Sequence, residues 1–171
     1  NIYNPQSLGL IMELGATRWV APVEATREIV RSVLAAQPID AEVFAHGRLP
    51  LAFSARCFTA RRFNLQKEGC EFRCIGFPDG MPLKTREGES FLTINGVQTQ
   101  SARVYNLMHE VDSLREAGVT VLRTSPQSQG TADLLHAMRA ACDGTARPAA
   151  GRDEDWCDGF WHGRPGLERA A

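Results

Sequence analysis

Three of the five cysteines stand close together in the sequence and could bind a metal centre through sulfur. Cys57, Cys70 and Cys74 are separated by twelve and then three intervening residues. The thiolate is the soft ligand that iron–sulfur clusters and zinc select. Because residues four apart share one face of a helix, we expect Cys70 and Cys74 to lie one helical turn apart. On spacing alone, one shared iron–sulfur cluster and three separate thiols are equally open interpretations.

The sequence around these cysteines is basic. Positive charge nearby would lower the pKa of a thiol and offset the charge of an anionic cluster. The basic residues are Arg56, Arg61, Arg62, Lys67 and Arg73. The same side chains could instead contact the phosphates of RNA. Against that interpretation, the formal net charge is only −1 and no aromatic residues alternate with the basic ones to stack on bases.

Zinc is a second possible metal, with His46 or His109 completing a Cys₃His set. Closed zinc sites usually pair their ligands in tight C-x₂₋₄-C knuckles. Only Cys70 and Cys74 come near that spacing, so the sequence favours an iron–sulfur cluster over zinc.

Two acid–base pairs are weaker candidates for chemistry. Glu42 and His46 share one face of a predicted strand, where they could point into a site or form a buried hydrogen-bonded pair. His109 and Glu110 fall on a predicted amphipathic helix, and we expect them to be a solvated pair. No serine or cysteine protease set can be assembled, and the zinc-peptidase motif His-Glu-x-x-His is absent.

Length and composition set the bounds for these candidates. The chain has 171 residues, 43 % hydrophobic and 23 % charged, which is typical of a globular domain with a hydrophobic core. An odd number of cysteines without a visible secretory signal argues against a disulfide framework. No apolar run is long enough to span a bilayer, so we expect a cytoplasmic protein. Cys142 and Cys157 lie at the edge of a predicted linker or beyond it, and we expect neither to be a ligand.

Hydrophobic periodicity and turn residues predict an alternation of strands and helices. Helices are predicted to begin at Pro5, Pro22 and Thr131, and a longer amphipathic helix to cover residues 101–117. Strands are predicted at residues 19–21, 42–46, 51–53 and 119–123, with a hairpin within residues 81–98.

Such alternation predicts an α/β fold with a parallel sheet. A complete (β/α)₈ barrel needs about 250 residues, so we predict the C-terminal part of a TIM-like (β/α) barrel with a hairpin insertion and a C-terminal tail. Residues 1–142 would form the partial barrel domain with the cluster-binding cysteines, residues 143–155 a flexible linker, and residues 156–171 an aromatic docking segment. Trp156, Phe160 and Trp161 would either cover this chain's own fold or anchor a partner.

Residues 42–57 resemble the signature of the family catalogued as peptidase U32. That signature runs Glu-x-Phe, a glycine, a cysteine and then Gly-x-Cys, and here Glu42, Phe44, Gly47 and Cys57 match it. Two positions depart from it, with Pro50 in place of the first cysteine and Ala55 in place of the second glycine. The departures resemble the UbiV branch of the family, as do residues 49–57, 63–67, 92–101 and 159–163.

The resemblance implies a (β/α) barrel protein that holds a [4Fe–4S] cluster through four cysteines. Three of these match Cys57, Cys70 and Cys74, and the fourth is expected in an N-terminal part that this sequence lacks. Members of the branch work as a heterodimer with a UbiU paralogue, and a UbiT lipid-binding protein accompanies them. The implied activity is O₂-independent hydroxylation of the ubiquinone ring, with prephenate as the oxygen source, and not peptide hydrolysis. Base hydroxylation of RNA, as in other relatives, and a non-catalytic partner role are the alternatives.

Overall fold

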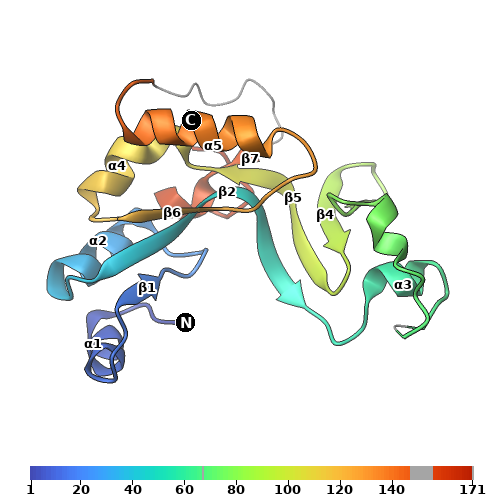
Figure 1. Cartoon of the computed structure of the whole chain (residues 1–171), viewed down its shortest axis with the longest axis horizontal. Coiled ribbons are helices and arrows are strands. Elements are labelled where there is room, and N and C mark those ends of the chain that lie inside the picture. Colours follow the sequence, from blue (N-terminus) through green and yellow to red (C-terminus); the bar gives the residue numbers. More distant parts are fainter. Residues whose placement is uncertain (67, 147–155, 171) are drawn as a thin grey trace.

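The computed structural model describes residues 1–66, 68–146 and 156–170. Its longest strand, β2 (Asp40–Phe53), joins two parts that are built differently (Figure 1). The first half of β2 lies among parallel strands covered by helices, and the second half lies in an antiparallel ladder. We call the first part the packed layer (residues 1–49, 105–146 and 156–170) and the second part the arm (residues 50–104).

The packed layer repeats a strand–helix unit. Strands β1 (Arg18–Val20) and β6 (Val121–Thr124) both pair in parallel with the first half of β2. A helix follows each strand: α2 (Arg27–Ala36) follows β1, α4 (Val111–Glu116) follows β2 and the arm, and α5 (Thr131–Cys142) follows β6. Helix α1 (Pro5–Glu13), which begins at the predicted proline, packs against α2. This alternation confirms the predicted α/β class.

Helix α2 begins one turn later than predicted. Pro22 was expected at its first position, but residues 22–25 form a separate turn in which the Ala25 amide donates to the Pro22 carbonyl over 3.0 Å. The helix starts after Thr26, whose hydroxyl accepts a 3.3 Å hydrogen bond from the Ile29 amide. A capping hydroxyl satisfies one of the free amides at a helix start, which proline at this place does not.

Strand β2 leaves the packed layer at Pro50. The strands predicted at residues 42–46 and 51–53 are one continuous strand, and its pairing with β5 (Gln98–Asn106) shifts register on both sides of Pro50. Proline has no amide to donate to the ladder, so a strand interior tolerates it at such irregular points. The neighbouring Leu49 amide donates instead to the buried Ser101 hydroxyl, at 2.9 Å.

The arm is an antiparallel sheet with two short helical turns at its outer end (Figure 1). From β2 the order runs through β5 to β4 (Ser90–Asn95) and β3 (Met81–Lys84), which confirms the predicted hairpin. Helix α3 (Phe58–Arg62) and the 3₁₀ turn η1 (Arg73–Gly76) cover that end. The Asp79 carboxylate ties the arm to the loop before α5 by accepting a 2.7 Å hydrogen bond from the Ser128 amide.

The helix predicted over residues 101–117 is wrong in its first half. Residues 98–106 form β5, which is hydrogen-bonded between β2 and β4. The side-chain amide oxygen of Asn106 then accepts a 2.9 Å hydrogen bond from the Met108 amide and turns the chain into η2 (Met108–Glu110) and α4. The apolar spacing that suggested one helix comes from a strand face followed by a short helix. Sheet pairing therefore overrides the local periodicity.

The C-terminal tail packs on the sheet. Its strand β7 (Trp156–Cys157) pairs in parallel with β5, and the 3₁₀ turn η3 (Gly159–His162) follows. Trp161 is 1 % exposed, and its indole N–H donates to the Ser113 hydroxyl of α4 over 3.1 Å. The tail's aromatic residues thus cover this chain's own fold. Residues 147–155, most of the predicted linker, and residue 171 lie outside the described residues.

The sheet is open, so the predicted barrel is not confirmed. Its seven strands run β1-β2-β5-β4-β3, with β6 added on β2 and β7 on β5, and only part of the pairing is parallel. The antiparallel arm continues β2 outward and does not curl back to β1. None of the helices in the described ranges combines the length and apolar composition needed to cross a membrane.

Candidate functional site

Cys57 lies where β2 has ended and α3 begins. Its sulfur caps the helix by accepting a 3.5 Å hydrogen bond from the Ala60 amide. The residue is partly exposed and its thiol is free. A cysteine in this position presents its sulfur at the helix start, where backbone amides point outward. Amide hydrogen bonds to sulfur are among the features that tune a cluster bound there.

Cys70 and Cys74 do not share a helix, which corrects the prediction from their spacing. Cys70 opens a tight turn in which its carbonyl accepts from the Arg73 amide over 3.2 Å, and Cys74 lies in η1. Two of the three residues between them, Glu71 and Phe72, have left-handed backbone with φ of +53° and +51°. Left-handed residues cannot continue a right-handed helix, so the chain turns after Cys70 and Cys74 follows in a separate 3₁₀ turn.

Backbone strain is concentrated between the first and last of the three cysteines. Among the described residues, the non-glycine positions with positive φ are Asn64, Glu71 and Phe72. Such conformations cost about 1–3 kcal/mol each and persist where the surrounding structure demands them, commonly at functional sites. The surrounding structure therefore holds the segment between Cys57 and Cys74 in a backbone conformation that its residue types do not favour.

Helix α3 packs against η1, which brings the segments of Cys57 and Cys74 together. The Phe63 and Phe77 rings lie 5.9 Å apart, and the Arg73 guanidinium lies 5.8 Å from the Phe63 ring centroid. Cys70 and Cys74 are, like Cys57, free and partly exposed. All three predicted ligand cysteines thus lie at the outer end of the arm with free, partly exposed thiols, and their sulfurs do not form a group within 4.8 Å of one another.

An open depression of about 660 Å³ lies beside Cys57 and α3. Its walls combine backbone and polar side chains with two of the predicted basic residues. They are Ala55, Arg56, Cys57, Ala60, Arg61, Asn64, Leu65, Gln66 and Glu68. Of the remaining basic residues, Arg73 pairs with Glu71 at 2.7 Å, and Lys67 lies outside the described residues.

The predicted pair of Glu42 and His46 is divided between different partners. Glu42 binds two arginines of the neighbouring strands, Arg123 of β6 at 2.5 Å and Arg18 of β1 at 3.6 Å. His46 Nδ1 is buried without a hydrogen-bond partner, and desolvation lowers the pKa of this histidine. Glu42 therefore stabilises the packed layer through charge, and the two residues do not form an acid–base pair.

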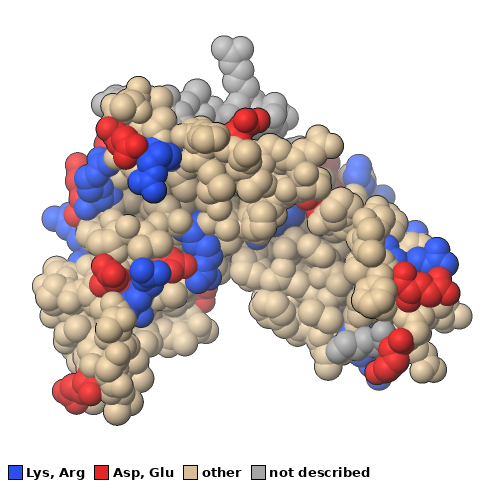
Figure 2. Space-filling model, in the orientation of Figure 1, with Lys and Arg blue, Asp and Glu red and all other residues tan. Residues whose placement is uncertain are grey.

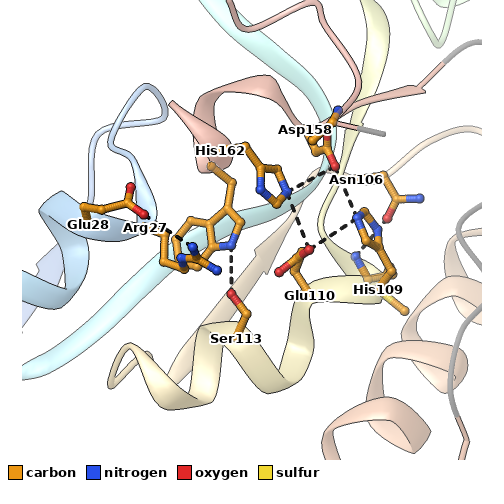
Figure 3. Close-up of polar contacts among 11 residues, drawn as sticks. Arg27, Glu28, Asn106, His109, Glu110, Ser113, Asp158 and His162 are labelled. Atoms are coloured by element: carbon orange, nitrogen blue, oxygen red, sulfur yellow. Dashed lines mark hydrogen bonds and ion pairs between the residues drawn. The ribbon is translucent and has the colours of Figure 1, made fainter. Parts of the chain in front are cut away.

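A second group of ionisable side chains lies in the packed layer, where the tail meets η2 (Figure 3). His109 Nε2 lies 3.2 Å from Asp158 Oδ2 and 3.7 Å from Glu110 Oε1. His162 Nε2 lies 3.4 Å and 3.5 Å from the same two oxygens. We call these four residues the histidine–carboxylate cluster.

This cluster was missed by the sequence analysis, which expected His109 and Glu110 to be a solvated pair. Both side chains are only about a fifth exposed, at 22 % and 17 %, and Asp158 is fully buried. Asp158 and His162 come from the tail, which reaches this place because β7 pairs with β5. Asp158 and His162 are themselves four residues apart, a weak local signal that does not point to a partner 49 residues away.

The described residues do not bring three cysteines and a histidine together into the predicted zinc site. Within the part of the chain that the structure describes, one group of three potential ligand atoms lies within 4.8 Å of one another, and it consists of His109, Glu110 and His162. No cysteine joins it. A Cys₃His set with His46 or His109 would need its sulfurs at comparably short separations.

The two remaining cysteines lie away from the arm. Cys157 is buried in β7, and desolvation raises its pKa to about 11, so it is a neutral thiol at physiological pH. Cys142 ends α5, where its carbonyl accepts a 2.7 Å hydrogen bond from Arg115. Cys142 lies at the end of α5 and Cys157 in the tail strand, so both belong to the packed layer.

The chain matches a known protein family over most of its length. The family described as peptidase family U32 matches over residues 1–156. That range includes the three cysteines of the arm and His109 and Glu110, and it ends where the tail strand begins. No solved structure matches the chain.

Proposed function

The chain belongs to peptidase family U32, and from that premise we propose that it acts as an iron–sulfur subunit of the UbiV type in O₂-independent hydroxylation of the ubiquinone ring. The observation that carries the proposal is the outer end of the arm. Three free, partly exposed thiols stand there around the strained segment of the described chain. A buried structural role would not leave all three accessible.

The proposed cofactor is a [4Fe–4S] cluster held by Cys57, Cys70 and Cys74. The donor set fits in chemistry, because all three are free thiols on two segments that pack together, and the Cys57 sulfur already accepts an amide hydrogen bond. The exposed Arg56 and Arg61 beside Cys57 would offset part of the cluster's negative charge. A fourth thiolate would come from outside this sequence. When bound, such a cluster supplies one-electron transfer.

The arm also offers a surface for a partner. Among the described residues of the arm, Ala60 is the one buried hydrophobic side chain, while many large apolar side chains are exposed. They are Leu51, Phe53, Phe63, Phe72, Ile75, Phe77, Leu83, Phe91 and Val97. On the face in Figure 2, the charged side chains of the arm lie toward its outer end and upper edge, and a broad area between them and the packed layer carries few charges. Exposed apolar surface of this extent is typical of protein interfaces.

We propose a UbiU-like paralogue as the partner on this surface, forming a heterodimer. A UbiT-like lipid-binding protein would deliver the apolar ubiquinone precursor, and prephenate would supply the oxygen atom. The parallel strands β1, β2 and β6, each followed by a helix, would be one segment of a (β/α) barrel that further chain completes. The proposal places the protein in the cytoplasm.

Complementation of an anaerobic culture tests the function. Cells that lack the protein and grow without O₂ would receive the natural full-length protein, its Cys57→Ala variant or its Cys142→Ala variant. We expect the wild type and Cys142→Ala to restore ubiquinone, measured by chromatography of extracted quinones, and Cys57→Ala to fail. Unchanged ubiquinone with Cys57→Ala at equal protein level would contradict the proposal.

Base hydroxylation of RNA is the second candidate, since the arm combines exposed arginines with exposed aromatic rings. Arg56 and Arg61 line the depression, and Phe53 and Phe72 are 74 % and 71 % exposed. Arginine and aromatic side chains together can bind the backbone and stack on the bases of single-stranded RNA. Salt-dependent binding of RNA that is weakened by Arg61→Gln, in a protein that leaves ubiquinone levels unchanged, would favour this candidate.

A further inference from the structure

The histidine–carboxylate cluster has the spacing of a metal coordination sphere. Its four neighbouring donor–donor distances, between His109 or His162 nitrogen and Glu110 or Asp158 oxygen, are 3.2, 3.4, 3.5 and 3.7 Å. Zinc binds imidazole nitrogen and carboxylate oxygen at about 2.0–2.2 Å, which puts adjacent ligands of a tetrahedral ion about 3.3–3.6 Å apart. Donor atoms of His109, Glu110 and His162 already lie within 4.8 Å of one another, and Asp158 Oδ2 lies 3.2 and 3.4 Å from the two histidine nitrogens.

Two ring nitrogens in the cluster, His109 Nδ1 and His162 Nε2, are buried without a hydrogen-bond partner, and the second of them lies beside the carboxylates. His162 Nε2 is buried and close to two carboxylate oxygens, yet it has no hydrogen-bond partner. His109 Nε2, in contrast, contacts Asp158 Oδ2 within hydrogen-bond distance, at 3.2 Å. A buried ring nitrogen without a partner is uncommon and costly. A metal ion between the four donors would use the lone pair of this nitrogen.

The charges of the cluster also call for a cation. Glu110 is 17 % exposed and Asp158 is fully buried, and the ion pairs that they make within the described ranges are with His109 and His162 alone. Two carboxylates this far from water need a compensating positive charge. A divalent ion neutralises both of them and leaves both imidazoles neutral, the form in which histidine binds metal.

The surrounding structure holds the donors in place. The His109 ring packs on the Trp156 ring at a centroid distance of 5.1 Å. The other carboxylate oxygen of Asp158 accepts a 2.7 Å hydrogen bond from the Ala170 amide, which fixes the carboxylate orientation as metal sites commonly require. Gly159 allows the close approach within the tail, since a Cβ there would lie 2.0 Å from the Pro165 carbonyl oxygen.

We infer that His109, Glu110, Asp158 and His162 form a site for one divalent transition-metal ion, which fastens the C-terminal tail to η2. Two imidazole nitrogens and two carboxylate oxygens suit Zn²⁺, Mn²⁺ or Fe²⁺. The partial exposure of both histidines, 22 % and 23 %, leaves a path by which the ion enters. The site is separate from the arm and does not rest on the function proposed for its cysteines.

Zinc titration of a purified variant of the natural protein, after treatment with a chelator, tests the site. The probe is Zn²⁺ alone, measured by calorimetry in a variant with Cys57, Cys70 and Cys74 all replaced by alanine, so that binding by these thiols is removed. We expect one ion per chain with a Kd below about 10 μM. Co²⁺ in place of Zn²⁺ should give the visible absorbance of a nitrogen- and oxygen-bound ion and no intense thiolate band.

Matched histidine variants assign the binding to this cluster. In the same background, His162→Gln and Glu110→Gln should each weaken Zn²⁺ binding by at least about 100-fold, the upper end of what losing even an outer partner of a ligand costs. His136→Gln, at an exposed position on α5, should leave binding unchanged. Near-ultraviolet circular dichroism of each variant checks that the tail still packs. Absence of Zn²⁺ binding in the variant that lacks Cys57, Cys70 and Cys74, or equal binding by folded His162→Gln, would overturn the inference.

Discussion

The packed layer and the arm share one strand but are stabilised in different ways. In the packed layer, side chains such as Leu8, Val30 and Trp161 are 1 % exposed and belong to one hydrophobic core. Within the described arm, Ala60 is the one buried hydrophobic side chain, at 2 % exposure. The arm is held together mainly by backbone hydrogen bonds between its strands, in the order β2, β5, β4 and β3. The three cysteines therefore lie on the part of the molecule that buries the fewer hydrophobic side chains. A bound cofactor or partner would increase the stability of this part more than that of the packed layer.

The largest expected effect is a difference in unfolding free energy between removing a buried aromatic ring of the packed layer and removing an exposed one of the arm. Trp161→Ala removes a buried indole and its hydrogen bond to Ser113, and should lower the free energy of unfolding by about 3–5 kcal/mol. Phe72→Ala removes an aromatic ring of similar class that is 71 % exposed, and should change it by less than about 0.5 kcal/mol. Urea unfolding of both variants measures the contrast. Similar losses from the two variants would mean that the arm is as tightly packed as the layer.

Replacing one glycine in each part by alanine compares how tightly the two parts are packed around the backbone. Gly47 in β2 has φ of +131°, and a Cβ there would lie 2.6 Å from the Ser125 Cβ. Gly88 in the arm has φ of +92° and open space around it. Both substitutions to alanine carry backbone strain of about 1–3 kcal/mol. Gly47→Ala should cost about 1–3 kcal/mol more in unfolding free energy because it also overpacks. An equal cost for both would show that the junction at β2 relaxes freely.

Hydrogen exchange should distinguish the two parts without any substitution. Few buried apolar contacts make local opening easy, so backbone amides of residues 54–66 and 68–80 should exchange faster than those of α2 and the first half of β2. Mass spectrometry of exchanged peptides gives the comparison. Binding of a cluster or partner to the arm should slow its exchange and leave the packed layer unchanged. Uniform protection in the isolated protein would contradict the contrast.

The smallest expected effect is a pH dependence that belongs to the packed layer. Desolvation lowers the pKa of His46 below its unfolded value of 6.5, so the folded protein binds this proton less readily than the unfolded chain. The stability that neutral His46 allows is therefore complete above pH 6.5 and is lost as pH falls toward the folded pKa. His46→Gln should reduce the loss of unfolding free energy between pH 7 and lower pH, measured by urea unfolding. An unchanged pH dependence would mean that another group carries it.

Local signals in the sequence predicted several elements well. Helix α1 begins at the expected proline, and the turns around residues 87–88 and 95–96 produce the hairpin strands. Helix α5 begins at the expected threonine, although its cap position is Gly130 in left-handed conformation and not a side-chain hydroxyl. These features depend on residues within a few positions of one another, which is why pattern alone reaches them.

The candidate sites needed information that local pattern does not hold. The turn between Cys70 and Cys74 depends on left-handed Glu71 and Phe72, residue types that rarely adopt this conformation and so give no warning. The histidine–carboxylate cluster depends on β7 joining β5, a pairing of segments about fifty residues apart. In both places tertiary structure decides against the helix that the spacing suggested.

Iron and sulfide content after anaerobic reconstitution tests the central claim, that the arm carries the redox centre. The measurement compares the natural full-length protein with its Cys57→Ala and Cys142→Ala variants, together with visible absorbance. We expect about four irons and matching sulfide in the wild type and in Cys142→Ala, and loss of both in Cys57→Ala. Iron retained by a folded Cys57→Ala variant, or no iron and sulfide in the wild type, would contradict the account.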